Sequence, residues 1–316
     1  ILSSFYKEIF FIFFQFKSWD SEFFFLQIRQ IVGYYSYTAF FVKYHSKSFF
    51  LMDDYSKGHI ARTMVLRRLG IKSVSMNHGL PLRVNQTGFW KYVDYDIYYS
   101  YGTFLYENFY KETWSKDILV KGVGSLRIPK ALYSKKLNSN RSNDILFLWG
   151  RTESKDNDLL LINAIFSLAD AYKDRIIYVR PKPSRIADND TDELFSALNS
   201  MPRENIIIKD NDLLGQHLTY ELMISCKFAV STGSTVLAEA IQLGCISYFL
   251  DFDTKLNDLY YRNFPQLCIY SINEMIDKIN SIESKSEVYN FDKLGELINQ
   301  SIIDPLPLIR KDLGLC

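Results

Sequence analysis

The sequence predicts an α/β protein of two doubly wound domains whose parallel sheets face a cleft. Short apolar runs alternate with helix-type patterns from Phe49 to about residue 128, a polar segment follows, and the alternation then resumes. Such alternation is typical of parallel sheets covered by helices on both faces. We therefore predict an N-terminal domain at 1–128, a linker at 129–143 and a C-terminal domain at 144–316.

The N-terminal half contains two predicted β-α-β units. The first carries Asp53 and Asp54 at the end of one strand, and Asn77-His78-Gly79 at the end of the next. Apolar runs bounded by turn residues indicate the strands, and helical spacing of apolar residues indicates the helices. The expected elements are strand 49–54, helix 56–70, strand 72–76, strand 94–100, helix 103–114 and strand 117–125.

The C-terminal half continues the same alternation after a linker rich in Ser, Asn and basic residues. Its expected strands are 144–150, 175–183, 205–210, 227–231 and 245–251, and its expected helices are 158–172, 190–201, 214–226, 234–244, 272–282 and 291–302. Ligands of doubly wound sheets bind at the carboxyl ends of the strands. Candidate site residues are therefore those that directly follow strands, and Gly150 and Arg151 are among them.

Composition and charge argue against several classes of partner and cofactor. The chain is 47% hydrophobic and 23% charged, as in a globular protein, and its net charge of +1 argues against nucleic acid as a partner. The four cysteines show no metal-ligand spacing, which indicates buried thiols in a reducing, cytoplasmic compartment. No metal-binding motif occurs, so we expect no metal or other cofactor.

The N-terminal 50 residues are rich in aromatic side chains. The start at Ile1 without a methionine indicates an incomplete N-terminal domain, and charges at Lys7, Glu8 and Lys17 interrupt the apolar run before it could span a bilayer. Two interpretations stay open. The segment is a core helix, or it is an aromatic face for peripheral contact with the inner face of a bacterial membrane or with a lipid-linked substrate.

A run of small hydroxyl residues lies between a predicted strand and helix. Gly233 lets a ligand approach its backbone, and the free N–H groups of the following helix attract phosphate. The alternative is an ordinary helix cap, and Glu239, one turn further on, either caps the loop or binds a ribose hydroxyl. The run comprises Ser231, Thr232, Gly233, Ser234 and Thr235.

Cations follow another predicted strand of the same half. Arg180 and Lys182 stand next to prolines, including Pro183, that stiffen their backbone. Fixed cations at a strand end suit a phosphate or a sugar acid. A solvated basic loop is the alternative.

His78 is the candidate acid–base residue, because an imidazole at a strand end can exchange protons near neutral pH. Its partner would come from the neighbouring strand end, where Asp53 or Asp54 could act as base or nucleophile. One of these carboxylates could instead cap the following helix. A lone histidine is also often structural.

These residues together resemble the GT-B glycosyltransferases, and among them the bacterial enzymes that build capsule and lipopolysaccharide chains. The resemblance covers roughly residues 49–251 and implies two Rossmann-like domains, the first for the acceptor and the second for the nucleotide sugar. It rests on Asn77–Gly79, Gly122–Ser125, Arg180–Pro183 and Ser231–Gly244.

The resemblance is greatest to transferases that use CMP-linked acidic sugars such as Kdo or sialic acid. It implies that Lys182-Pro183 stands for a His-Pro pair and that Ser231-Thr232 or Ser234-Thr235 stands for a hydroxyl pair on the CMP phosphate. The implied reaction is metal-independent transfer of the sugar to a hydroxyl of an oligosaccharide or a lipid-linked glycan. UDP-sugar and CDP-glycerol transferases, a nucleotide-sugar 2-epimerase and a non-catalytic glycan-binding subunit remain alternatives.

Overall fold

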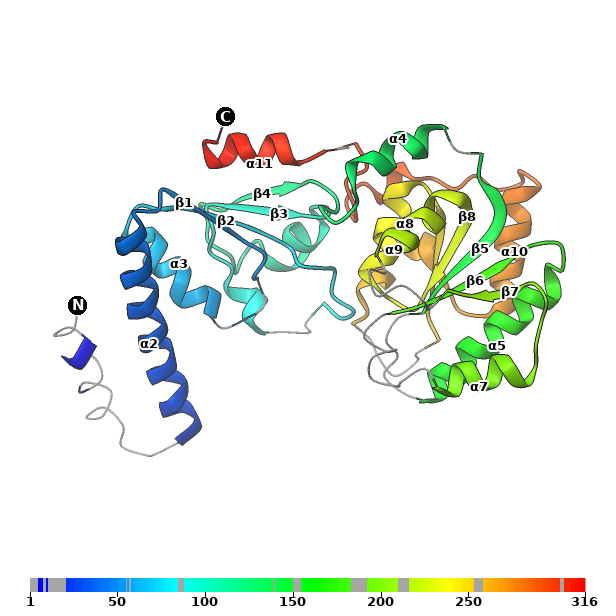
Figure 1. Ribbon diagram of the computed structural model, residues 1–316, viewed down its shortest axis with the longest axis horizontal. Helices are drawn as coiled ribbons and strands as arrows, with labels where there is room; N and C mark the ends of the chain where they lie inside the picture. Colours follow the sequence, from blue (N-terminus) through cyan, green and yellow to red (C-terminus); the bar gives the residue numbers. More distant parts are fainter. Residues whose placement is uncertain are drawn as a thin grey trace.

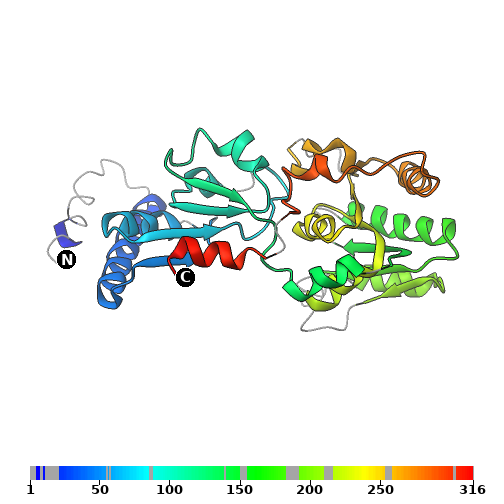
Figure 2. The same cartoon turned by 90° about the horizontal axis from the view of Figure 1, so that it is seen from above.

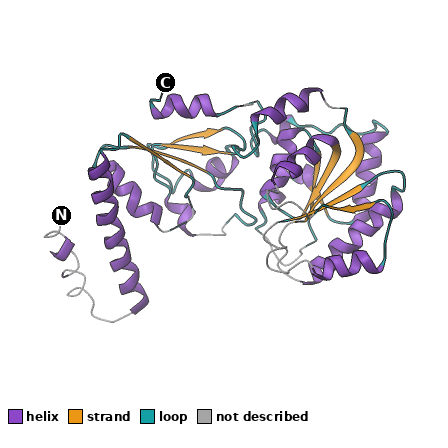
Figure 3. Cartoon of the chain, in the orientation of Figure 1, coloured by secondary structure: helices purple, strands orange, loops and turns teal. Residues whose placement is uncertain are grey.

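The computed structural model describes residues 5–7, 10, 21–54, 56, 58–84, 88–138, 140–149, 155–182, 192–209, 216–252, 258–301 and 304–315. Its strands form two parallel sheets, each packed against helices (Figure 1 and Figure 3). The predicted fold class, two α/β domains built on parallel sheets, is confirmed. Over these ranges, no helix combines the length and the apolarity that crossing a membrane requires.

The first sheet has the strand order β1-β2-β3-β4, with all neighbours parallel. Its strands are β1 (Ser48–Leu51), β2 (Lys72–Met76), β3 (Ile97–Ser100) and β4 (Leu119–Gly122). Helix α3 (Gly58–Arg68) joins β1 to β2, and the long helix α2 (Ser21–Tyr44) packs on α3 at the outer end of the domain (Figure 1). Because Leu51 pairs with Ser75, the loops that follow β1 and β2 are neighbours.

The second sheet has the order β10-β9-β8-β5-β6-β7, again with parallel neighbours. Its strands are β5 (Ser142–Trp149), β6 (Ile177–Pro181), β7 (Ile206–Ile208), β8 (Cys226–Ser231), β9 (Ile246–Leu250) and β10 (Cys268–Ile269). One face packs on α5 (Lys155–Ala171), α7 (Asp192–Ser200) and α10 (Ile272–Glu283). The other packs on α4 (Lys130–Asn138), α8 (Gln216–Ser225) and α9 (Thr235–Leu243). Successive side chains of β5, such as Phe147 and Leu148, therefore enter opposite cores.

A third apolar core joins the two domains. It contains Tyr98 and Trp114 from the first domain together with Leu237, Tyr260 and Leu297 from the second, all buried. Interfaces between domains are usually more polar than this, and an apolar interface opposes relative motion of the domains. The two sheets are thus held in a fixed relation on this side of the molecule.

The segment 129–143, predicted as a linker, contains helix α4. Leu132 and Tyr133 are buried against the second sheet, and they anchor the helix. The surrounding Lys, Ser and Asn residues conceal these two apolar positions in the sequence. Two buried side chains are enough to fix a short helix whose polar face meets solvent.

Two predicted helices are wrong in form. The segment 103–114 contains the short π-helix η2 (Tyr106–Tyr110), and the segment 291–302 contains only the 3₁₀ turn η5 (Asp292–Leu294). Beyond η5 the backbone makes hydrogen bonds to the first domain: Phe104 N donates to Glu296 O at 3.0 Å, and Asn299 N donates to Tyr101 O at 2.8 Å. Contacts distant in sequence thus replace the expected helix.

The last helix, α11 (Leu306–Leu313), was not expected and lies alongside the first sheet (Figure 1 and Figure 2). Its Ile309 is buried with strand residues of that sheet, and Asp312 accepts hydrogen bonds from Lys121 Nζ at 2.6 Å and from the Tyr99 hydroxyl. The chain therefore returns to the first domain within the range 144–316 that the sequence assigned to the second.

Candidate functional site

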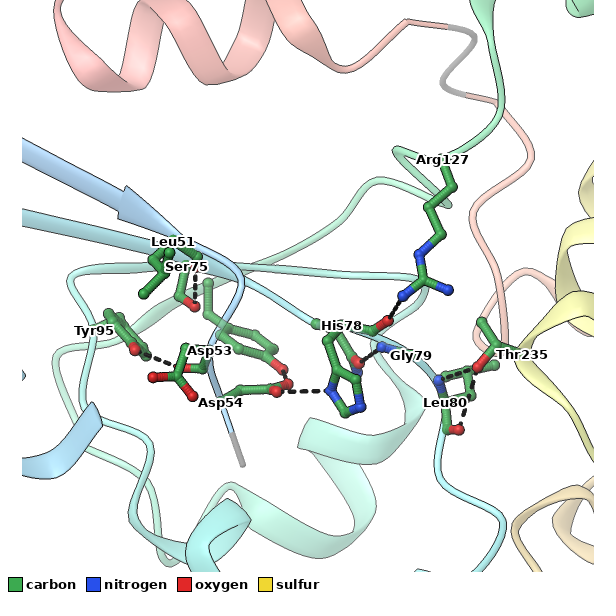
Figure 4. Close-up of polar contacts among 12 residues, drawn as sticks. Leu51, Asp53, Asp54, Ser75, His78, Gly79, Leu80, Tyr95, Arg127 and Thr235 are labelled. Carbon is green, nitrogen blue, oxygen red and sulfur yellow. Dashed lines mark hydrogen bonds and ion pairs between the residues drawn. The ribbon is translucent and has the colours of Figure 1, made fainter. Parts of the chain in front are cut away.

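The turn Asn77-His78-Gly79 places the candidate histidine at the carboxyl edge of the first sheet (Figure 4). Asn77 Oδ1 accepts a hydrogen bond from Gly79 N at 2.8 Å, which closes the turn. A Cβ atom on Gly79 would lie 2.8 Å from Thr235 Oγ1, so a side chain here would collide with the second domain. Glycine at this position therefore allows the two domains to meet beside His78.

His78 and Asp54 form a dyad. The imidazole Nδ1 lies 3.0 Å from Asp54 Oδ1 (Figure 4). The fully buried carboxylate accepts a second hydrogen bond from the Tyr98 hydroxyl. Burial, and then the negative charge of Asp54, raise the pKa of Tyr98 well above its usual value, so Tyr98 remains a donor. A carboxylate fixed in this way orients an imidazole and selects its tautomer. The His78 side chain is 35% exposed and so can reach a ligand.

The two neighbouring carboxylates have different surroundings. Asp53 Oδ2 lies 2.8 Å from Arg62, and its carbonyl accepts from the Tyr95 hydroxyl at 2.6 Å. Burial by itself raises the pKa of Asp53, but hydrogen bonds from Ser56 and Arg62 outweigh it and the net pKa is lowered. Of the two candidates for base or nucleophile, only Asp54 contacts His78 among the described residues.

The hydroxyl loop follows β8 in the second domain. The side-chain oxygens of Ser231 and Thr232 are buried, and neither has a hydrogen-bond partner in the described part of the chain. Gly233 has a positive φ of 76°, and a Cβ there would lie 2.6 Å from Leu82 Cδ1. Ser234 is the N-cap of α9, but its side chain makes no cap hydrogen bond. The loop thus holds hydroxyl groups that the described structure does not use.

Thr235 links this loop to the turn of the first domain. Its Oγ1 accepts a hydrogen bond from Leu80 N at 2.9 Å and lies 3.4 Å from Leu80 O (Figure 4). The predicted phosphate loop and the predicted acid–base turn are therefore in direct contact. Two segments 155 positions apart share one site.

The two predicted cations that the structure describes have different surroundings, one buried and one exposed. Arg180 is buried, and it donates to Thr219 Oγ1 at 3.0 Å and to the carbonyl of Lys209. This position, which ties β6 to α8, does not fit the role predicted for Arg180 on a donor phosphate. Lys182 has an exposed side chain at the end of β6, and its N–H donates to Trp149 O at 3.1 Å. Gly150, Arg151 and Pro183 lie outside the described residues.

Glu239 lies between the domains instead of at an open surface. Its buried carboxylate accepts hydrogen bonds from Ser125 Oγ at 2.7 Å and from the Tyr220 hydroxyl at 3.2 Å. Burial raises the pKa of Glu239, and these hydrogen bonds offset only part of that rise. Glu239 therefore joins the two domains through Ser125, and neither predicted role, a loop cap or a ribose ligand, matches this placement.

Sequence reasoning missed two residues of the site. Arg127 donates to the carbonyl of His78, and the Tyr98 hydroxyl holds the carboxylate of Asp54 (Figure 4 labels Arg127). Arg127 directly follows the Gly122–Ser125 motif, whose position could have drawn attention to it. Tyr98 is one of several tyrosines in its strand, and the sequence has no signal that separates it from the others.

Metal ligands are not gathered anywhere in the described ranges, since no three His, Cys, Asp or Glu side chains lie close enough together to hold an ion. Besides the His78–Asp54 dyad and the unpaired hydroxyls of the loop, the site contains the exposed cation Arg127. Such an arrangement can move a proton and bind an anion.

No protein-family model matches the chain, and no curated protein matches it. Among solved structures, it is similar to the UDP-GlcNAc 2-epimerase from Neisseria meningitidis bound to UDP-GlcNAc, with 14% identity, 92% of this chain and 82% of that chain covered, and a TM-score of 0.59. The UDP-GlcNAc 2-epimerase from Methanocaldococcus jannaschii is 14% identical, the match covers 90% of this chain and 82% of that chain, and the TM-score is 0.59. A glycosyltransferase from Rickettsia africae ESF-5 is 13% identical, the match covers 95% of this chain and 83% of that chain, and the TM-score is 0.52.

At these identities the similarity establishes the fold. The chain has the two-domain GT-B architecture, in agreement with the resemblance drawn from its motifs. Fold by itself does not define a reaction, because one architecture supports many functions.

Proposed function

We propose that the chain is an enzyme that acts on a nucleotide sugar bound between its two domains. The observation that carries this proposal is the position of the His78–Asp54 dyad beside the hydroxyl loop, with Thr235 in contact with Leu80. The hydroxyls of Ser231 and Thr232, which have no partner among the described residues and lie next to the first turn of α9, would bind the phosphate groups. The dyad would act on the sugar.

The reaction we propose is transfer of the sugar to a hydroxyl of a glycan acceptor. His78 Nε2 would take the proton of the acceptor hydroxyl while Asp54 stabilises the imidazolium that forms. The acceptor oxygen would bond to the anomeric carbon, and the bond from that carbon to the phosphate oxygen would break. The nucleotide would leave with the electron pair, and backbone N–H groups and Arg127 would stabilise its charge.

The donor proposed from the sequence is a CMP-linked acidic sugar such as Kdo. Two of the similar structures described above are UDP-GlcNAc 2-epimerases, and one of these is bound to UDP-GlcNAc. We therefore give UDP-GlcNAc the first place in a donor screen and retain CMP-linked sugars as the second. We propose that no metal takes part, and an unchanged rate in the presence of EDTA would support this.

Epimerisation is the second candidate function, and the similarity to 2-epimerases favours it. In that reaction a base would remove the proton at C2 of the sugar while the bond from C1 to the nucleotide oxygen breaks. The nucleotide would then add back to C1 and a proton to the opposite face of C2, so no acceptor is needed. Incubation with UDP-GlcNAc in D₂O separates the two functions. A C2-deuterated isomer formed without acceptor supports epimerisation, whereas release of nucleotide only when an oligosaccharide is present supports transfer.

We also propose that α2 contacts an anionic membrane surface, close to a lipid-linked acceptor. Phe25, Val32 and Phe40 are exposed on this helix. The chain has no Asp or Glu from 23 to 52, whereas Arg29 and Lys43 lie among the exposed apolar residues. A second copy of the chain would bring like charges together, whereas anionic headgroups would match these cations.

A further inference from the structure

A small, partly open pocket lies in the first domain directly beside the dyad. Among its lining residues are Asn77, which precedes His78, and Tyr98, whose hydroxyl binds Asp54. Trp90 also lines it, and the Trp90 ring lies 6.0 Å from the imidazole of His78. The pocket admits a group of about the size of a water molecule and is too small for a sugar ring.

The aromatic walls of the pocket are fixed by their own contacts. Tyr110 and Trp114 stack with their ring centroids 5.4 Å apart, and Tyr98 meets Trp114 edge to face at 4.9 Å. The polar atoms of these rings are already bonded: Trp114 Nε1 donates to Trp90 O, and the Tyr110 hydroxyl donates to Val84 O. These walls therefore present mainly carbon to a ligand.

One polar group of a lining residue is different. Trp90 is 5% exposed, and its Nε1–H has no hydrogen-bond partner in the described ranges of the chain. A buried donor without an acceptor is costly to the folded state, and such groups are normally satisfied by water or by a ligand. A ligand group suited to this pocket would combine a small apolar part with one oxygen acceptor.

We propose that the pocket receives the hydroxymethyl group of a pyranose substrate. A hydroxymethyl group extends one bond further from the ring than a ring hydroxyl, so it can enter where the ring cannot. Its hydroxyl, which is about the size of a water molecule, would enter the pocket and accept from Trp90 Nε1, while its methylene would stay at the opening. The proposal rests on the proposed function in that the substrate is a sugar, and it makes Trp90 a residue that determines specificity beside His78.

The test is a titration of the full chain, followed by ligand-observed NMR, with glucose, mannose and N-acetylglucosamine. Each sugar is compared with its 6-deoxy analogue. Wild type is expected to bind at least one hydroxymethyl sugar about fivefold or more tightly than the analogue, as for one hydrogen bond. Trp90→Phe, which removes the N–H group, should reduce this preference to below about twofold.

Trp149→Phe is the matched control, because it removes another buried indole, from the second domain, and should leave the preference intact. Equal binding of the sugar and its analogue by wild type, or an unchanged preference in Trp90→Phe, would overturn the proposal. So would a lack of binding by all three sugars at millimolar concentration, because the pocket would then hold only water.

A loss of folding in Trp90→Phe is checked by thermal unfolding, and Ser100→Ala serves as the second variant. Ser100 lines the same pocket, and this change removes a single oxygen. The variant should bind the hydroxymethyl sugar more weakly than wild type does, without a change in its binding of the 6-deoxy analogue. An equal effect on the binding of both sugars would contradict the proposal. UDP and CMP are titrated separately. If neither UDP nor CMP bound, the proposed function would be refuted, whatever the sugar preference.

Discussion

His78 Nδ1 lies 3.0 Å from Asp54 Oδ1, although the two residues stand 24 positions apart in the chain. The contact forms because β1 and β2 are adjacent and parallel, so their carboxyl ends meet at one edge of the sheet. Asp54 is fully buried, and the Tyr98 hydroxyl occupies its second oxygen. Within the described part of the chain, the carboxylate therefore reaches a substrate through His78.

Asp54→Asn should lower kcat by about 100-fold or more, because an amide no longer stabilises the imidazolium or selects its tautomer. The rate of nucleotide release, or of isomer formation, is measured for wild type and variant. Nucleotide binding by calorimetry is the control and should change by less than about twofold, since the hydroxyl loop is untouched. A variant with wild-type kcat would exclude the dyad from the chemistry.

Asp53→Asn should reduce stability without a specific effect on the chemical step. The change weakens the pair with Arg62, which is itself buried, and should cost about 2 kcal/mol in the free energy of unfolding, as measured with urea. The folded pKa of Asp53 is lowered, so its contribution is present at neutral pH and is lost as the pH falls through that pKa. The variant should therefore lose less stability than wild type below about pH 4.

The hydroxyl loop offers a matched pair of substitutions. Ser231→Ala removes a hydroxyl without a partner in the described chain, so the free energy of unfolding should change by less than about 0.5 kcal/mol. Nucleotide binding should nevertheless weaken by about fivefold. Thr235→Val breaks the hydrogen bond from Leu80 N and should cost about 1 kcal/mol of stability. If Ser231→Ala bound nucleotide like wild type, the loop would not be the phosphate site.

Glu239→Gln should change how stability depends on pH. Burial raises the pKa of Glu239 in the folded protein above its value in the unfolded chain. Protonation of Glu239 therefore stabilises the folded state of wild type at low pH, and this stabilisation is lost as the pH rises from about 4.5 through the folded pKa. Glutamine has the shape of the protonated carboxyl and cannot ionise. The variant's Tm should therefore fall less than that of wild type over this range. Parallel Tm profiles of the two proteins would contradict the assignment.

Contact of α2 with membranes is tested by co-sedimentation with vesicles of neutral phosphatidylcholine, with and without anionic phosphatidylglycerol. Binding should require the anionic lipid and decrease with salt. Lys43→Glu should weaken it by about fivefold or more, because each cation near such a surface contributes about that factor. Val288→Ser, at an exposed apolar residue of the second domain, is the control and should bind as wild type does. Equal binding of Lys43→Glu and wild type would refute the contact.

The failures of sequence-based prediction have a common cause. Alternating strands and helices are local patterns, and they correctly indicated both parallel sheets and placed candidate residues at strand ends. The helix predicted at 291–302 failed because Glu296 and Asn299 pair with the first domain, over distances that no local pattern contains. Arg180 and Lys182 had the same signal in sequence, yet one is buried and the other exposed.

The sequence by itself determined the fold class and the set of side chains available for chemistry. Helical and strand periodicity, together with glycines such as Gly79 and Gly233, carry that information because backbone preferences and burial act over a few residues. The tertiary structure alone decided which of Asp53 and Asp54 contacts His78. It also enclosed Glu239 between the domains and brought Thr235 against Leu80. These outcomes depend on packing between distant segments, and packing sets both the partners of each charge and the exposure of each side chain.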